Sequence, residues 1–188
     1  PDIPAGVVPV IGPRARAIYQ HGQTQGNGRT TLSQIGDSIT ASEDFLKPLG
    51  AGPVEWGAYG ALQPVYYAFR ASFARPSLAA RGGWTSLDLL NPASSFAPEL
   101  CEPYESPLVC EYRVARPAVA LIMIGTNDIP LRVDDSTYRQ NLETIVRISA
   151  DFGVIPVLST IPDNLTNPDD SERVHTLNAI IRDVAASA

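Results

Sequence analysis

Several features are scarce in this sequence, and each scarcity argues against a class of protein. No apolar run approaches the roughly 20 residues that a membrane-spanning helix needs, and the longest, residues 118–124, is the size of a strand. We therefore expect a soluble chain with no membrane span. The 188 residues carry a net charge of −6, and their 14 Lys and Arg residues are scattered rather than gathered in a stripe. A nucleic-acid partner is therefore not expected.

Histidine and cysteine are also scarce, with two residues of each type. No cluster of His, Cys and carboxylate residues has metal-ligand spacing, so we expect no metal site. Cys101 and Cys110 flank the Pro-rich stretch CEPYESPLVC, whose length permits a local disulfide. Two reduced thiols are the alternative. A disulfide would indicate an oxidising compartment, and on this basis we expect an extracellular or secreted protein.

The size of the chain fits one domain. Residues 1–30 are rich in Pro, Gly and Gln and predict an extended N-terminal arm with one short helical piece at 13–20. The chain begins with Pro1 rather than Met, so we expect a leader or upstream segment to have been removed. The main domain is expected at residues 31–188.

Alternation of strand and helix patterns predicts an α/β fold. A β-branched strand at 31–35 runs into Gly36, and the continuous apolar run at 119–124 is typical of a strand buried on both faces. A helix at 136–152 and a strand at 154–161 follow. This βαβ order predicts that the last two strands are parallel neighbours in the sheet interior.

Two further helices are predicted from apolar residues at helical spacing. A core-facing helix is expected at 59–73, and a final helix is expected from about residue 171. The buried stripe of the first is Leu62, Val65, Tyr66, Phe69 and Phe73, and that of the second is Val174, Leu177, Ile181 and Val184. Residues 92–117 read as a long Pro-rich insertion without regular structure, and such loops tend to be functional.

Three polar stretches stand where a predicted strand ends or a helix begins: GDS at 36–38, GGWTS at 82–86 and GTND at 125–128. The carboxyl ends of parallel strands form a ligand crevice, so these stretches are expected to converge. Ester cleavage needs a hydroxyl nucleophile, donors for the oxyanion and a base. Ser38 can supply the first, and the N–H groups of Ser38 and Gly83 with the Asn127 amide can supply the second.

Each residue also has a purely structural interpretation. Ser38 can cap an ordinary turn, and Asn127 and Asp128 can bond their own loop backbone. Asp37 is expected to shape its turn rather than to react. The three stretches together favour the catalytic interpretation.

The motifs GDSI at 36–39, Gly83 within RGGWTSLDLL and IGTND at 124–128 resemble the first three blocks of the SGNH, or GDSL, hydrolase family. The resemblance runs from about Thr31 to Ile161. It implies a flavodoxin-like three-layer α/β/α sandwich with a central parallel sheet, serine esterase or lipase activity, and no metal or other cofactor. It also implies that Ser38 is the nucleophile and that Gly83 and Asn127 join the N–H of Ser38 in an oxyanion hole.

The family's fourth block, Asp-x-x-His, does not occur in this chain. His21 and His175 are wrongly placed for it, and both are expected to be surface histidines. The alternative for His21, which lies in the N-terminal arm, is that the arm folds over the crevice. We therefore expect a C-terminally incomplete domain that lacks its last strand and catalytic-His loop, and a partner chain could cover the resulting edge.

Two functions remain open. The first is a secreted serine hydrolase that cleaves an acyl or acetyl ester of a carbohydrate or lipid-like substrate. The second is a non-catalytic extracellular binding or structural module on the same scaffold. An Asp-x-x-His sequence soon after Ala188 would support the enzyme, and its absence would support the module.

Overall fold

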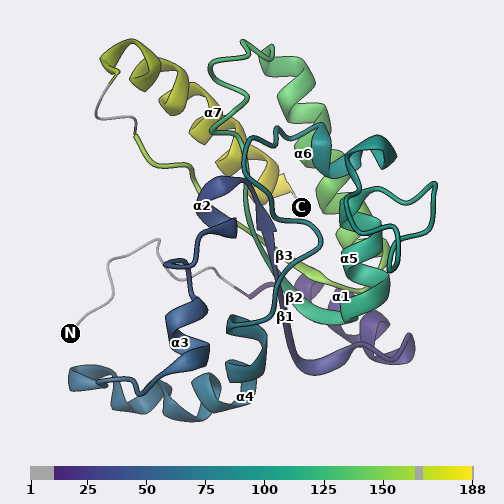
Figure 1. Ribbon diagram of the computed structural model, residues 1–188, viewed down its shortest axis with the longest axis vertical. Helices are drawn as coiled ribbons and strands as arrows, with labels where there is room; N and C mark the ends of the chain where they lie inside the picture. The colour runs from purple at the N-terminus through teal and green to yellow at the C-terminus, as the bar shows by residue number, and fades with distance from the viewer. Residues whose placement is uncertain (1–10, 164–166, 188) are drawn as a thin grey trace.

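A three-stranded parallel sheet lies at the centre of the computed structural model, which describes residues 11–163 and 167–187 (Figure 1). The strands are β1 (Gly28–Gly36), β2 (Pro117–Met123) and β3 (Ile155–Leu158), in the order β1-β2-β3. Ile35 pairs with Ile122, and Leu121 pairs with Val157. A single parallel bridge between Gly36 and Ala80 adds to the sheet on the outer side of β1. The predicted α/β class is therefore confirmed.

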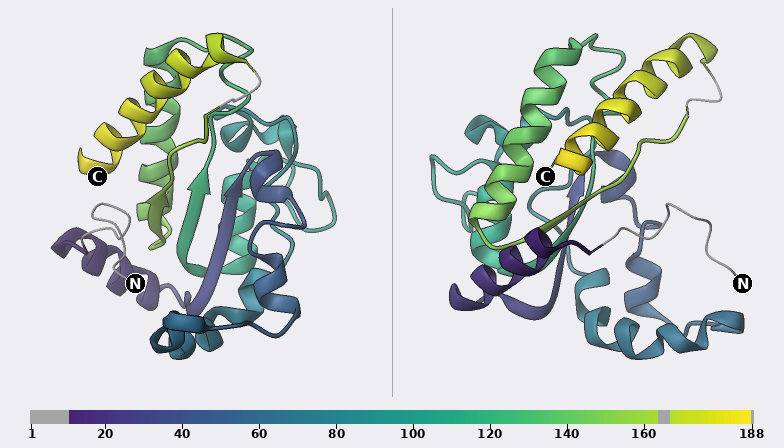
Figure 2. Two further views of the ribbon diagram at one scale, coloured as in Figure 1. Left: turned by 90° about the vertical axis from the view of Figure 1, so that its left-hand side faces the viewer. Right: turned by 180° about the vertical axis from the view of Figure 1, so that it is seen from behind.

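Helices flank this sheet, as Figures 1 and 2 show. The α-helices are α1 (Pro13–Thr24), α2 (Ser38–Ala41), α3 (Lys47–Ala51), α4 (Gln63–Phe73), α5 (Pro107–Ala115), α6 (Asp135–Asp151) and α7 (Pro168–Ser187). Three short 3₁₀ helices complete the described elements: η1 (Gly57–Leu62), η2 (Asp88–Leu90) and η3 (Pro92–Ser94). Within the described ranges, no helix is long and apolar enough to cross a membrane.

The β2–α6–β3 unit forms as its sequence pattern predicts, with the two strands parallel. The carboxylate of Asp134 caps α6 by accepting hydrogen bonds from the N–H groups of Ser136 and Thr137, which otherwise have no acceptor in the first turn. One part of the prediction is wrong, because β3 lies at the edge of the described sheet rather than in its interior. Consistent with this position, all its residues are only half-buried.

The main core lies on one face of the sheet. Ile35, Ala120 and Ile122 on this face belong to one buried cluster with residues of α5, α6 and α7. The predicted stripe of the last helix is fully part of it, since Val174, Leu177, Ile181 and Val184 are all buried. α4 packs along the outer edge of β1, where the Ser72 hydroxyl accepts a hydrogen bond from Leu32 N at 3.0 Å.

The first predicted helix is only partly as expected. It begins as the 3₁₀ helix η1 and becomes α-helical from Gln63, with Pro64 in the first turn of α4. Tyr66 is buried, and its hydroxyl donates to the carbonyl of Leu49. Leu62 and Val65 are instead 49% and 57% exposed. Leu62 of η1 and Val65 of α4 therefore do not face the core, although their spacing predicted that they would.

The expectation of an unstructured insertion at 92–117 is wrong, because this segment contains α5. Ser106 is the N-cap of α5 and Pro107 is its first residue, a position where the missing N–H of proline costs nothing. Leu108 and Tyr112 are buried in the core and hold the helix against the sheet. One of the prolines that suggested a loop is therefore the first residue of a helix.

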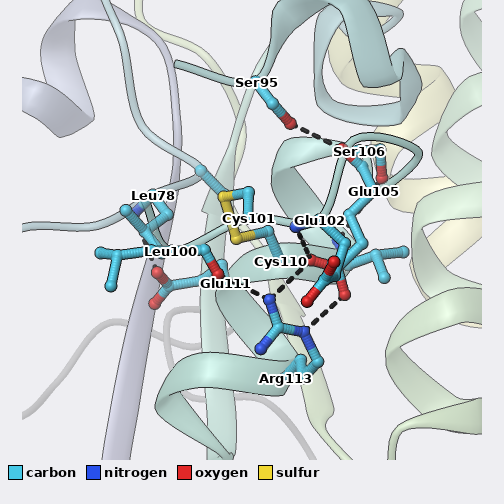
Figure 3. Close-up of a disulfide and its surroundings, with 12 residues drawn as sticks. Leu78, Ser95, Leu100, Cys101, Glu102, Glu105, Ser106, Cys110, Glu111 and Arg113 are labelled. Carbon is cyan, nitrogen blue, oxygen red and sulfur yellow. Dashed lines mark hydrogen bonds and ion pairs between the residues drawn. A yellow bond between two sulfur atoms is a disulfide. The ribbon is translucent and has the colours of Figure 1, made fainter. Parts of the chain in front are cut away.

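The predicted disulfide between Cys101 and Cys110 is confirmed, with a Cα–Cα distance of 5.3 Å. It joins the loop before α5 to the first turns of the helix (Figure 3). Glu105 ties the same loop down: its carboxylate accepts from Arg113 Nε at 2.5 Å and from the N–H of Glu102 at 2.9 Å. The loop and α5 are thus one fixed unit beside β1.

Candidate active site

Ser38 lies in the sharp turn that follows the end of β1. Residues 32–37 are all buried, whereas Ser38, the first residue of α2, is exposed. Asp37 is the N-cap of α2 and accepts a hydrogen bond from Ile39 N at 3.0 Å, so it shapes the turn as predicted. Gly36 allows this turn to pack closely, because a Cβ atom there would lie 2.2 Å from the carbonyl oxygen of Met123 on β2.

Gly83 follows a segment that runs beside the end of β1. Gly36 N donates to Ala79 O at 2.9 Å, and Arg81 N donates to Gly36 O at 3.2 Å. A Cβ atom at Gly82 would lie only 3.7 Å from the Cβ of Ser38. Gly83 is exposed, and its N–H has no hydrogen-bond partner among the residues that the structure describes. This N–H is therefore available to an acceptor beside Ser38.

Asn127 belongs to the loop that follows β2, the strand adjacent to β1. Its amide Nδ2 donates a hydrogen bond to Trp84 O at 2.8 Å. The amide carries two hydrogens, so this bond leaves one for a further acceptor. Asn127 is thereby fixed next to the residue that follows Gly83. The structure thus brings the three predicted stretches together at the carboxyl ends of neighbouring strands.

A buried hydrogen-bond cluster joins the second and third stretches, and the sequence did not point to it. The Asp128 carboxylate accepts from Ser86 N at 2.9 Å and from Ser86 Oγ at 2.6 Å. Asn141 on α6 donates to Ser86 Oγ at 2.9 Å. Ser86 and Asp128 are fully buried, so Asp128 connects two loops instead of bonding only its own. We call Ser86, Asp128 and Asn141 the loop clamp.

Burial sets the electrostatics of the two carboxylates nearest these loops. Burial raises the pKa of Asp37 above its usual value, against the opposing effect of the Ile39 N–H. Burial likewise raises the pKa of Asp128, although its hydrogen bonds from Ser86 oppose that shift. No group of three or more His, Cys, Asp and Glu residues within the described part of the chain is arranged to hold a metal ion.

Neither histidine forms a hydrogen bond with Ser38 in the part of the chain that the structure describes. His21 lies on α1, where its Nε2 is 3.2 Å from the carbonyl oxygen of Asp151. Asp151 ends α6 just before β3 begins, so His21 lies at the end of the sheet opposite to Ser38. His175 is exposed on α7, between the buried residues of its stripe. Both are therefore surface histidines, as expected from the sequence.

Comparisons with known proteins agree with this arrangement. The family model of the GDSL-like lipase/acylhydrolase family matches residues 35–188, which is most of the chain and includes all three motifs. The chain belongs to this family of ester hydrolases. None of the curated proteins compared with the chain matches it.

A solved structure is similar in fold. It is that of an acetyl xylan esterase from Geobacillus stearothermophilus, with a TM-score of 0.51 and 20% sequence identity over 86% of this chain and 74% of that one. The parallel sheet with flanking helices is therefore the SGNH hydrolase fold, as the sequence motifs predicted.

Proposed function

We propose that this GDSL-family chain is a serine esterase in which Ser38 attacks the carbonyl carbon of an ester. The N–H groups of Ser38 and Gly83 and the Asn127 amide would then stabilise the oxyanion of the tetrahedral intermediate. The observation that carries the proposal is the joining of three loops around an exposed Ser38, through the Gly36 and Arg81 backbone bonds and the bond from Asn127 to Trp84.

The substrate class that we propose is an acyl or acetyl ester of a carbohydrate or lipid-like molecule. The fold is that of a protein named as an acetyl xylan esterase, which makes a carbohydrate acetyl ester the first substrate to test. We also propose that the protein is extracellular, because its Cys101–Cys110 disulfide is of the kind that persists in an oxidising compartment.

A general base is the component that neither histidine supplies at this site. We propose that it belongs to an Asp-x-x-His block on further polypeptide, carried by a strand that pairs with the outer edge of β3. That edge has no partner strand within the described residues, and it lies on the side of the sheet away from β1. The position of His21 at the opposite end of the sheet, and the lack of a hydrogen bond from either histidine to Ser38 among the described residues, also favour the second function, a non-catalytic binding module.

Hydrolysis of p-nitrophenyl acetate by two lengths of the protein tests these proposals. Without a positioned base we expect this chain to be slower by several powers of ten than a version extended beyond Ala188. Ser38→Ala in the longer version should abolish the activity, whereas the matched change at Ser136, an exposed serine on α6, should not.

Two results would contradict the esterase mechanism in this form. Full activity of this chain would mean that another group acts as the base. An inactive longer version that contains an intact Asp-x-x-His block would favour the binding module instead.

A further inference from the structure

The end of the sheet opposite to Ser38 is built from two segments without acidic residues. Residues 11–36 and 112–127 contain no Asp or Glu, although the chain has 20 acidic residues in all. The two segments lie side by side, because β1 pairs with β2 and Gly28 N donates to Arg116 O at 2.8 Å. Figure 2 shows α1 and the start of β1 together at this end of the molecule, away from α2.

Three exposed arginines gather at this end, although they are far apart in the sequence. Arg29 Nε donates to Gln23 Oε1, in the last turn of α1, at 3.1 Å. Arg116 reaches the turn after α1, where its Nη1 lies 3.4 Å from the position that a Cβ atom of Gly26 would take. Arg16 shares a face of α1 with Gln23, because seven residues are close to two helical turns. We call Arg16, Arg29 and Arg116 the arginine surface.

The charges of the arginine surface have no ionic partner within the described ranges. None of its three side chains forms an ion pair there, whereas six other cationic side chains do. Asp151 also lies beside α1, where its carbonyl oxygen is 3.2 Å from His21 Nε2, but its carboxylate pairs with Arg147. The surface is therefore a local concentration of positive charge in a chain whose net charge is −6.

The side chains around these cations are polar rather than apolar. No large hydrophobic residue is exposed between residues 12 and 36, so α1 lacks the apolar face that inserts into a lipid layer. Gln20 is exposed one turn from Arg16, and its amide can both donate and accept hydrogen bonds, as sugar hydroxyl groups require. The proposed extracellular location also favours a polysaccharide over a nucleic acid.

We propose that the arginine surface binds the carboxylate groups of an acidic polysaccharide. A polymer with carboxylates on successive sugar units can reach several guanidinium groups at once, and the planar fork of each one matches a carboxylate. Gln20 binds a sugar hydroxyl group between them. Because the surface lies at the end of the sheet opposite to Ser38, a bound polymer leaves the proposed active site open. The interaction holds the protein on its polymer and does not depend on the esterase function.

Binding of polygalacturonate, measured by calorimetry, tests the proposal without requiring catalysis. The neutral comparison is the fully methyl-esterified polymer, which lacks the charge, and both are measured with Ser38→Ala so that no ester is consumed. We expect polygalacturonate to bind at least about tenfold more tightly. Its affinity should fall at least about tenfold between about 20 mM and about 200 mM NaCl, because binding releases counterions from the polymer.

Two matched variants locate the binding. The first removes the arginine surface and carries Arg16→Gln, Arg29→Gln and Arg116→Gln. The second changes the net charge by the same amount near the carboxyl ends of the strands, and carries Arg81→Gln, Arg132→Gln and Arg139→Gln. The first should lose the preference for polygalacturonate, and the second should keep it. Lysine at the three positions of the arginine surface keeps the charge without the fork, and should give an intermediate affinity.

Equal affinity for the two polymers would overturn the proposal, as would an equal loss of affinity in the two glutamine variants. A three-lysine variant that binds no better than the first glutamine variant would also overturn it, because charge would then not be the cause. Duplex DNA and phosphatidylglycerol vesicles are measured at the same salt concentration. Tighter binding to either than to polygalacturonate would show that the surface takes a different polyanion, and would refute the polysaccharide.

Discussion

Single residues decide how firmly Gly83 and Asn127, two of the three proposed oxyanion donors, are held relative to each other. Ser86 donates both its N–H and its hydroxyl to the buried Asp128 carboxylate. We expect Ser86→Ala to destabilise the protein by about 1–3 kcal/mol, because it leaves a buried carboxylate short of a donor. Ser136→Ala, which removes a surface hydroxyl bonded to Asp134, should change stability by about 0.5 kcal/mol or less. Denaturant titration of both variants measures the difference.

The same variant should also slow the proposed reaction. Ser86→Ala removes one of the bonds that hold the loop after Gly83 to the loop that carries Asn127, although the Ser86 N–H bond to Asp128 remains. Misplacing reactive groups by about 1 Å can cost up to about 100-fold in rate. The loss should appear in kcat rather than in KM, measured with p-nitrophenyl acetate on the active form. A destabilised variant with unchanged kcat would show that the loop clamp is only structural.

Gly125, at the start of the Asn127 loop, has no room for a side chain. Its φ is +135°, and a Cβ atom would lie 2.6 Å from the hydroxyl oxygen of Tyr138. That hydroxyl is buried and donates to Ile124 O at 2.8 Å. We expect Gly125→Ala to cost about 1–3 kcal/mol from backbone strain alone. Gly60→Ala is the matched control, because no atom lies within 4 Å of its Cβ position. Thermal unfolding that ranks the two variants equally would contradict this account.

Residue by residue, the sequence predicted the three loops but not what holds them together. Ser38, Gly83 and Asn127 could be chosen because each lies where a predicted strand ends or a helix begins, a local feature. The loop clamp joins Asn141 to Ser86, 55 residues apart in the chain. No periodicity or turn signal encodes such a contact, since it arises only when α6 packs against the sheet.

At the scale of elements, the unit made of α5 and its disulfide loop should depend on pH. The hydrogen bond from Arg113 lowers the pKa of Glu105 below its usual value. This interaction therefore stabilises the fold above the pKa of the unfolded chain, about 4.3 for an ordinary Glu. The stabilisation is lost as the pH falls through the lower pKa of the folded protein.

The variant Glu105→Gln isolates this contribution. Its melting temperature should lie below that of the wild type at pH 7, and the gap should close as the pH falls below about 4. Glu99→Gln, an exposed glutamate in the same loop, should show no such gap. A gap that stays constant from pH 7 to pH 3 would show that the charge of Glu105 contributes nothing.

The elements themselves were predicted unevenly, for physical reasons. The β2–α6–β3 unit was predictable because β2 is a continuous apolar run, the helix has apolar residues at helical spacing, and each element has sharp boundaries in the sequence. α5 was missed because Pro107 suggests a loop, although proline is well suited to the first helical position. The face of α4 was misjudged because apolar spacing indicates which residues share a face, not whether another element covers it.

At the scale of the whole molecule, the sheet is covered unevenly. One face is sealed by α5, α6 and α7. On the other face Val119, Leu121 and Val157 are only half-buried. A cavity of about 350 Å³, lined by β3 and by residues of α1, α6 and α7, runs along the outer edge of β3. Backbone groups on that edge have no strand partner within the described residues.

An unpaired strand edge beside apolar surface promotes pairing with another strand. We therefore expect this chain to associate weakly in a concentration-dependent manner, detectable by sedimentation velocity at about 100 μM. Val157→Lys places a charge on β3, the kind of residue that blocks edge pairing, and should shift the protein to monomer. Arg147→Lys on the exposed side of α6 keeps its charge and should change nothing. A chain that remains monomeric at every concentration would show that the β3 edge is protected without a partner, and it would weaken the proposal that a further strand pairs there.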